Sequence, residues 1–201
     1  MGSYECFEIK GKLLEFIETT HTYLYNGVVL PSITQLLKVK FGNKYNGISK
    51  ETLERAAEQG TAVHKAIEDF EQSGTESSLP ELRNYKFLKR AYNFECVSNE
   101  VPVVLFWNEE AVAAGRLDLV LTEGEQIGLG DIKRTSALDK NYLAYQLNLY
   151  RIAYQQCYGS NIEFLRGLHL REDTRKYVTL PINESLAYEI LNEYFKENEN
   201  E

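Results

Sequence analysis

The stretch AGRLDLVLTEGEQIGLGDIK, residues 114–133, decides the fold of this chain. It contains two short apolar runs, Leu117–Thr122 and Ile127–Ile132, separated by a polar turn with a glycine. Such a pattern predicts a β-hairpin. With Gly124-Glu125 as a two-residue loop, glycine occupies the first central position, as a type II′ turn prefers.

This turn sets the register of the hairpin and brings two acids together. Residues equally distant from the turn pair with each other, so Asp118 faces Asp131, with β-carbons roughly 4.5–5.5 Å apart. Arg116 and Lys133 share that face, because side chains two residues apart on a strand point the same way. Two carboxylates facing a lysine can hold a divalent, oxygen-seeking ion. The alternative is a solvated hairpin face over an apolar core, and a longer turn would separate the two acids.

The composition indicates one domain, residues 1–201. With 43% hydrophobic and 12% aromatic residues, 201 residues can bury one full core. Cys6, Cys96 and Cys157 are far apart, so we expect neither a disulfide framework nor a zinc finger, and a reducing cytosol as the setting. The sequence has no charged and apolar leader and no apolar run near ~18 residues, so we expect neither secretion nor a membrane span.

The net charge of -8 argues against a nucleic-acid partner, because Lys and Arg drive phosphate binding. Much of this charge lies in an acidic C-terminal helix and tail, residues 183–201. Two segments, Lys38–Lys50 and Ser78–Phe94, are basic by contrast. Either segment could hold an anionic strand, although such a run is also typical of a solvated face.

An N-terminal hairpin is predicted for residues 15–33. Asn26-Gly27 divides an alternating apolar and polar pattern and tolerates the positive φ angles of a type I′ turn. Ser32 is a plausible N-cap for a short helix, Ile33–Val39. His21 lies on this hairpin, and we leave it out of the site because a lone strand histidine is usually structural.

The next helical pattern runs from Ser49 to about Gln72, with an interruption at Gly60. His64 and Glu68 are one turn apart on the same side of this helix. A neutral His64 imidazole could ligate a metal, or His64 could pair with Glu68 at the surface.

Two further elements carry candidate site residues. Residues 97–107 read as a long strand, in which Pro102 suggests an edge position or a bulge. Glu100 on this strand could extend the carboxylate cluster, but its spacing does not fix where it points. A helix is predicted for residues 138–158, and Gln146 and Tyr150 project from it together, although Tyr150 could be core packing with a satisfied hydroxyl. A strand pair, 162–170 and 176–180, and a helix, 185–196, complete the chain.

Four motifs follow one another in the order G-T-x-V-H at 60–64, G-R-L-D at 115–118, D-I-K at 131–133 and Q-L-N-L-Y at 146–150. Together they resemble the PD-(D/E)XK nuclease superfamily, in its RecB-like, phage-type exonuclease branch. The resemblance covers residues from about His21 to Tyr158. It implies an α/β fold with a restriction-endonuclease-like core, in which helices flank a central mixed β-sheet and the N-terminal β-hairpin is added.

The resemblance also implies roles for the matched positions. Asp118 and Asp131 would bind Mg²⁺ or Mn²⁺, with His64 and the backbone carbonyl of Ile132 as further ligands. Lys133 would orient or activate the attacking water and stabilise charge on the phosphate. Gln146 and Tyr150 would support the site and contact the nucleic-acid backbone. The additional candidates are Glu68, Glu100 and Arg116.

Two features distinguish this chain from some relatives. The acid of the D/E-x-K motif is Asp131, where many members have Glu, and both are attested in the family. Some relatives hold an iron-sulfur cluster with four cysteines, whereas this chain has three that are dispersed, so we expect no iron-sulfur cluster.

These observations predict a metal-dependent DNA exonuclease that acts in phage-type replication or recombination, on linear double-stranded or single-stranded ends. The site has no Ser or Cys nucleophile beside a base, so direct attack by water is preferred to a covalent intermediate. One alternative is a structure- or site-selective endonuclease of the same fold, and another is a catalytically silent DNA-binding subunit. The resemblance also admits a homo-oligomer and a recombination partner protein.

Overall fold

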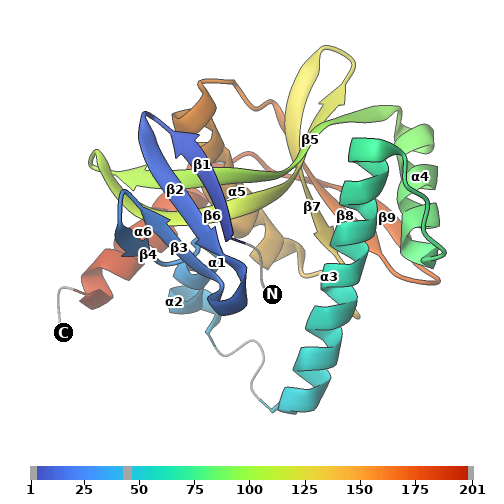
Figure 1. Cartoon of the computed structure of the whole chain (residues 1–201), viewed down its shortest axis with the longest axis horizontal. Helices are drawn as coiled ribbons and strands as arrows, with labels where there is room; N and C mark the ends of the chain where they lie inside the picture. The colour runs from blue at the N-terminus through green and yellow to red at the C-terminus, as the bar shows by residue number, and fades with distance from the viewer. Residues whose placement is uncertain (1–3, 43–46, 199–201) are drawn as a thin grey trace.

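The structure is a computed structural model that describes residues 4–42 and 47–198. Helices flank a mixed five-stranded sheet, and a smaller antiparallel sheet is formed by the N-terminal strands (Figure 1). The large sheet has the order β5 (Phe94–Trp107), β6 (Glu110–Glu123), β7 (Gln126–Lys133), β8 (Phe164–Leu170) and β9 (Arg175–Leu180). Only the β7–β8 pair of this sheet is parallel. The predicted α/β fold with a central mixed sheet is confirmed, while a restriction-endonuclease-like core stays a prediction.

The β6–β7 hairpin has the predicted register. Gly124 adopts a φ of 63°, which the first central position of a type II′ turn requires. Glu123 pairs with Gln126, and the ladder continues to Leu119 and Gly130. It ends there, one pair before Asp118 and Asp131, so the two acids lie at the mouth of the hairpin.

Helices cover both faces of the large sheet. One face is covered by α5 (Lys140–Tyr158) and α6 (Glu184–Asn198), with the short helices α1 (Ile33–Leu36) and α2 (Lys38–Phe41) beside them. The other face is covered by α3 (Lys50–Ser73) and α4 (Pro80–Tyr92). Neighbouring residues of β6 face opposite cores, because Val120 packs with Leu147 of α5, whereas Leu119 packs with Ile67 of α3.

The N-terminal region forms more than the single hairpin predicted for residues 15–33. Asn26 and Gly27 take φ angles of 51° and 79°, so the predicted turn between β3 (Thr22–Tyr25) and β4 (Val28–Leu30) is confirmed. A second turn at Lys10-Gly11 joins β1 (Tyr4–Ile9) to β2 (Lys12–Ile17), and the four strands form one antiparallel sheet. The prediction was therefore too short, because residues 15–17 end β2 and a 3-10 turn, Glu18–Thr20, precedes β3.

Two helical predictions need correction. Ser32 caps α1 as predicted, through a reciprocal pair of hydrogen bonds with Gln35, but a second short helix replaces the expected continuation to Val39. The interruption predicted at Gly60 is wrong, because α3 is continuous through it. A helical glycine costs only about 1 kcal/mol relative to alanine, and the Ser49 cap and the buried second half of α3 offset that cost. Within the described residues, no helix is both long and apolar enough to cross a membrane.

Candidate functional site

A cavity of about 640 Å³ lies where α3 approaches β5, β6, β7 and the N-terminal sheet. All but one of the residues that the sequence singled out for the site line this cavity. They are His64, Glu68, Glu100, Arg116, Asp118, Asp131, Lys133, Gln146 and Tyr150. The remaining candidate, Ile132, takes part through its backbone. The structure therefore brings together residues from α3, three neighbouring strands and α5.

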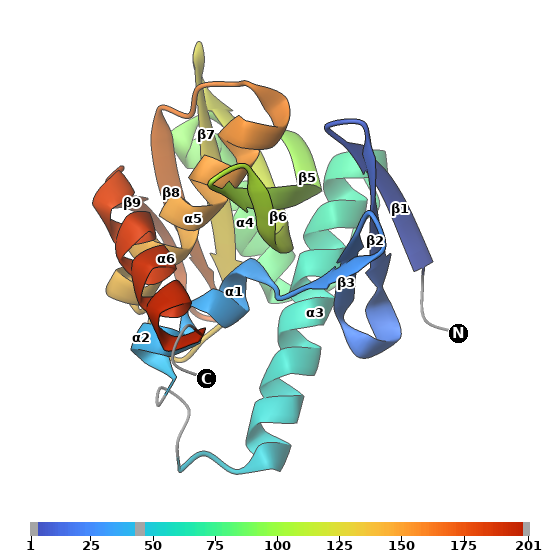
Figure 2. The ribbon, with the colours of Figure 1, turned by 90° about the vertical axis from the view of Figure 1, so that its left-hand side faces the viewer.

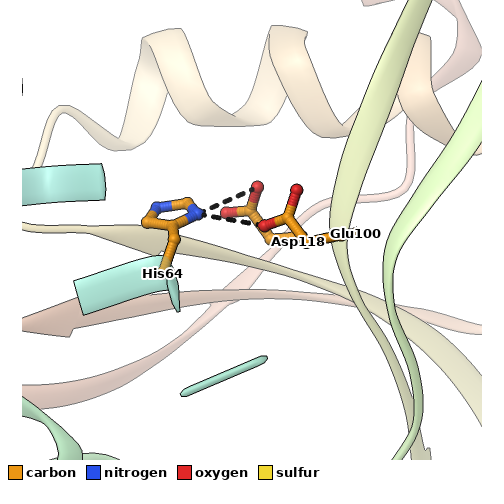
Figure 3. Close-up of side chains that lie close together, drawn as sticks. All are labelled: His64, Glu100 and Asp118. Atoms are coloured by element: carbon orange, nitrogen blue, oxygen red, sulfur yellow. Dashed lines mark ion pairs between the residues drawn. The ribbon is translucent and has the colours of Figure 1, made fainter. Parts of the chain in front are cut away.

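The His64 imidazole faces two carboxylates at the centre of the cavity (Figure 3). Its Nδ1 lies 3.5 Å from Oε1 of Glu100 and 3.6 Å from Oδ1 of Asp118. One nitrogen and two carboxylate oxygens from these residues all lie within 4.8 Å of one another. The alternative of a surface pair between His64 and Glu68 is not what the structure has, because His64 faces Glu100 and Asp118 and Glu68 pairs with Lys65 at 3.2 Å. The role of His64 as a metal ligand stays a prediction.

Glu100 reaches the centre of the site because β5 is the strand next to β6. Asn99 pairs with Leu119 and Val101 pairs with Leu117, so Glu100 lies level with Asp118. Glu100 itself has a φ of 48°, in the left-handed region. The carboxylate that sequence could not orient thus belongs to the cluster of His64, Glu100 and Asp118, and its other oxygen, Oε2, lies 3.4 Å from Nε of Arg116.

Asp131 lies in the same cavity but outside the His64 cluster. Its Oδ2 forms an ion pair of 2.6 Å with Nζ of Lys133, and its Oδ1 accepts a hydrogen bond of 2.7 Å from Nε2 of Gln146. The resemblance implied Asp131 as a direct ligand beside His64 and Asp118. In the structure Asp131 contacts Lys133 and Gln146, and the third acidic or imidazole member of the His64–Asp118 cluster is Glu100. The role of Asp131 as a metal ligand stays a prediction.

The backbone of Ile132 connects the two halves of the site. Its N–H donates to Oδ2 of Asp118 at 2.7 Å, and its carbonyl oxygen lies 3.3 Å from Nε2 of His64. A metal-ligating histidine commonly donates its second ring N–H to a backbone carbonyl, which fixes the ring and the tautomer. In the structure the Ile132 carbonyl contacts His64 on the side opposite Nδ1, which faces the acids, and its role as a metal ligand stays a prediction.

Burial and close charges perturb the ionisable groups of the site. Burial lowers the pKa of His64, but the carboxylates of Asp118 and Glu100 outweigh this effect and raise the pKa to about 9. Burial raises the pKa of Asp131 to about 6, with Lys133 opposing and Asp118 adding to the shift. The pKa of Asp118 is also raised by burial. Burial lowers the pKa of Lys133, yet Asp131 and Asp118 outweigh it and the pKa is raised, so Lys133 is a cation at neutral pH.

Arg116 and Tyr150 form two sides of the site. Nη1 of Arg116 pairs with Oε1 of Glu5 at 2.9 Å, which links the site to β1 of the N-terminal sheet. The Tyr150 ring is buried and packs against the backbone of Gly115, where a β-carbon would lie 2.8 Å from its hydroxyl oxygen. Burial raises the pKa of Tyr150 well above its usual value. The glycine of the G-R-L-D motif thus makes room for this tyrosine.

The N-terminal sheet contributes one wall of the cavity, which no local sequence pattern predicts. Phe16, Tyr23 and the exposed His21 line the cavity, although His21 had been left out of the site. The His21 ring contacts both aromatic rings edge-on, with centroids 5.3 and 5.7 Å away. His21 has a φ of 49° and caps the 3-10 turn rather than sitting within a strand. Its position depends on contacts between two sheets, which local patterns do not encode.

The described residues of the two basic segments do not line this cavity. Among the described lysines, Lys40 pairs with Glu189, Lys50 with Glu54 and Lys89 with Glu71. Lys44 lies outside the described residues. These ion pairs fit a solvated surface, the alternative that the sequence had left open.

The donor set fits a hard divalent cation. An imidazole nitrogen and carboxylate oxygens are ligands that Mg²⁺ or Mn²⁺ accepts. The raised pKa values of Asp118 and Asp131 reflect buried acids that a cation between them would stabilise. His64, Glu100 and Asp118 could hold such an ion, with Asp131 and Lys133 beside it.

Comparison with known proteins adds little to this description. No protein-family model matches the chain, and no curated protein matches it. The crystal structure of SSO0001 is similar in arrangement, with 15% sequence identity and a TM-score of 0.46 over 83% of this chain and 75% of that one. A likeness at this level identifies neither a family nor a function.

Proposed function

We propose that this chain is a divalent-metal-dependent nuclease, and specifically a DNA exonuclease of phage-type replication or recombination. The observation that carries the proposal is the meeting of His64, Glu100 and Asp118 with the Asp131–Lys133 ion pair in one cavity. The order of the four sequence motifs supports the same activity. Phosphodiester hydrolysis needs a deprotonated water and compensation for charge on the phosphate, and a bound divalent cation supplies both.

The residues of the chain have separate tasks in this proposal. His64, Glu100 and Asp118 hold the cation, and Ile132 fixes the orientation of His64 and Asp118 through its backbone. Lys133 stays protonated because two carboxylates raise its pKa. It therefore acts as a fixed positive charge that positions the attacking water and stabilises the phosphate, rather than as the base.

Gln146 and Asp131 keep Lys133 in place. The Gln146 amide donates to one oxygen of Asp131, which leaves the other oxygen directed at the Lys133 ammonium. A small error in the position of a catalytic group can cost about 100-fold in rate. We therefore assign Asp131 and Gln146 a positioning role, and Asp131 also contributes a negative charge to the site.

The test is digestion of end-labelled linear DNA in Mg²⁺ or Mn²⁺, with a chelator as the blank. Lys133→Gln should lower the rate by about 10²–10³-fold, as expected for the loss of a group that stabilises the transition state. Lys176→Gln, on exposed β9 away from the cavity, is the matched control and should digest DNA at the wild-type rate. Equal rates for wild type and Lys133→Gln would overturn the proposal.

The two alternative functions predict different results in digestion and binding assays. Cutting of covalently closed circular DNA would favour the structure- or site-selective endonuclease. Binding of DNA with no hydrolysis in either metal would favour the catalytically silent subunit.

A further inference from the structure

A second cavity, of about 400 Å³, opens beside the first. It lies between the first half of α3 and the segment of residues 134–139 that links β7 to α5. We call it the α3 cleft. Lys133 lines both cavities, so the α3 cleft lies next to the candidate active site.

The first half of α3 is a wall with an unburied apolar surface. Both ribbon views show this end of the helix extending away from the rest of the fold (Figures 1 and 2). The buried residues of α3 begin at Val63, so its first three turns bury none. Apolar residues line the cleft from both sides. Leu53 and Ala56 lie on α3, Ile48, which is 45% exposed, lies just before it, and Leu138 lies on the linking segment.

The cleft is cationic, although the chain has a net charge of -8. Among the described residues, its lining includes Lys133, Arg134 and Arg171, with Asp139 as the one acid, although Lys133 is already paired with Asp131 at 2.6 Å. The Asp139 carboxylate is already used as the N-cap of α5. Arg134 is held by Glu81 at 2.8 Å, whereas no carboxylate of the described residues pairs with the Arg171 guanidinium. Arg171 is therefore available for an anion.

Two side chains contact backbone carbonyls of the linking segment that lines the cleft. Nε2 of His169, a residue that is 3% exposed, lies 2.7 Å from the carbonyl oxygen of Thr135. The Thr135 hydroxyl donates to the carbonyl of Ala137 at 2.8 Å. These bonds hold the linking segment in place beside α3.

We propose that the α3 cleft binds a single nucleic-acid strand that continues from the active site, an inference that rests on the proposed function. Apolar side chains beside a free guanidinium suit a strand whose bases are unpaired, because the bases pack on the wall and the phosphates meet the cation. In a duplex the base faces are stacked inside the helix and cannot contact the wall. A cavity of 400 Å³ also lies in the range of roughly 300–1,000 Å³ for pockets that enclose one small organic molecule.

The test measures binding without divalent metal, so that no strand is cut. Labelled oligodeoxythymidylate and oligouridylate are titrated with the full chain at several salt concentrations, and anisotropy is recorded. Each single-strand phosphate contact contributes about 0.7 to the slope of log affinity against log salt. Arg171→Gln should therefore lower this slope by about 0.7. Arg55→Gln, an exposed arginine on the same half of α3 but outside the cleft, should leave it unchanged.

A second variant tests the apolar wall. Ile48→Ser should weaken binding by about fivefold or more, within the range for lost base contacts, without changing the salt slope. The difference between the two oligonucleotides tells whether DNA or RNA is preferred. The proposal would be overturned if a blunt duplex bound more tightly than a single strand, or if poly-glutamate displaced the strand as well as an unlabelled strand does. It would also be overturned if wild type and Arg171→Gln had equal salt slopes.

The outcome separates this inference from the proposed function. If strand binding depends on Arg171 but no hydrolysis occurs in Mg²⁺, the proposal for the α3 cleft stands and the proposed nuclease function is excluded. If hydrolysis occurs in Mg²⁺ but strand binding does not depend on Arg171, the proposed nuclease function stands and the proposal for the α3 cleft is excluded.

Discussion

Gly115→Ala should destabilise the protein by pressing a methyl group against Tyr150. The new β-carbon would lie 2.8 Å from the Tyr150 hydroxyl oxygen and 3.1 and 3.3 Å from the ring atoms Cε1 and Cζ. Ordinary contacts begin near 3.4 Å. Tyr150 is 6% exposed, so its ring cannot move without displacing the neighbours that pack around α5. Overpacking of this kind costs about 1–3 kcal/mol.

The Tyr150→Phe background isolates the cause. Removing the hydroxyl removes the shortest of the three contacts, so Gly115→Ala should cost at least about 0.5 kcal/mol less in that background than in the wild type. Urea unfolding, with free energies compared at equal m-values, measures both penalties. Gly60→Ala is the matched control, because its β-carbon would meet nothing within 4 Å and α3 is helical there. It should raise stability by up to about 1 kcal/mol.

The same cycle contains the result that would refute this reasoning. If Gly115→Ala costs the same with and without the Tyr150 hydroxyl, the contact is not the cause. If it costs nothing in either background, Tyr150 does not pack against the G-R-L-D strand as described.

Three further predictions concern the metal-ligating cluster and the entry to α1. Manganese affinity should rise between pH 6 and pH 9, because the ion binds His64 only as the neutral imidazole, whose pKa is raised to about 9, and because ionised Asp131, whose pKa is raised to about 6, adds a negative charge beside the ion; calorimetry in buffers of different ionisation enthalpy should show proton release at neutral pH, and an affinity independent of pH would contradict this. Glu100→Gln should weaken manganese binding at least about tenfold by removing one anionic ligand, while Glu54→Gln on exposed α3 should not, so equal affinities in a titration would exclude Glu100 from the cluster. Ser32→Ala should lower the free energy of unfolding by about 1 kcal/mol in urea, because it removes the acceptor for the Gln35 N–H, and an unchanged unfolding curve would show that this cap is not needed.

Local rules predicted the elements that depend on a few neighbouring residues. Gly124 at a hairpin turn was sufficient to set the β6–β7 register, and Asn26-Gly27 set the β3–β4 turn. The pairing of strand positions then put Asp118 and Asp131 at the same end of one hairpin. Gly159, the residue after the helix predicted for residues 138–158, ends α5 with a φ of 71°.

Long-range contacts and irregular backbone account for what the sequence missed. A bulge between Cys96 and Ser98 and the left-handed φ of Glu100 break the alternation of β5, so no strand rule could orient the Glu100 carboxylate. The N-terminal sheet contributes His21 to the cavity through packing against a distant part of the chain. The ion pair between Lys133 and Asp131, two residues apart on one strand face, was within reach of the sequence pattern. The bond from Gln146 across the fold was not.

Titration of the metal-free protein with Mn²⁺ tests the central claim most directly. The account predicts saturable binding by the wild type and its loss in Asp118→Ala, with far-ultraviolet circular dichroism unchanged. An identical isotherm for wild type and Asp118→Ala, or no binding by either, would contradict the claim that His64, Glu100 and Asp118 form a divalent-cation site.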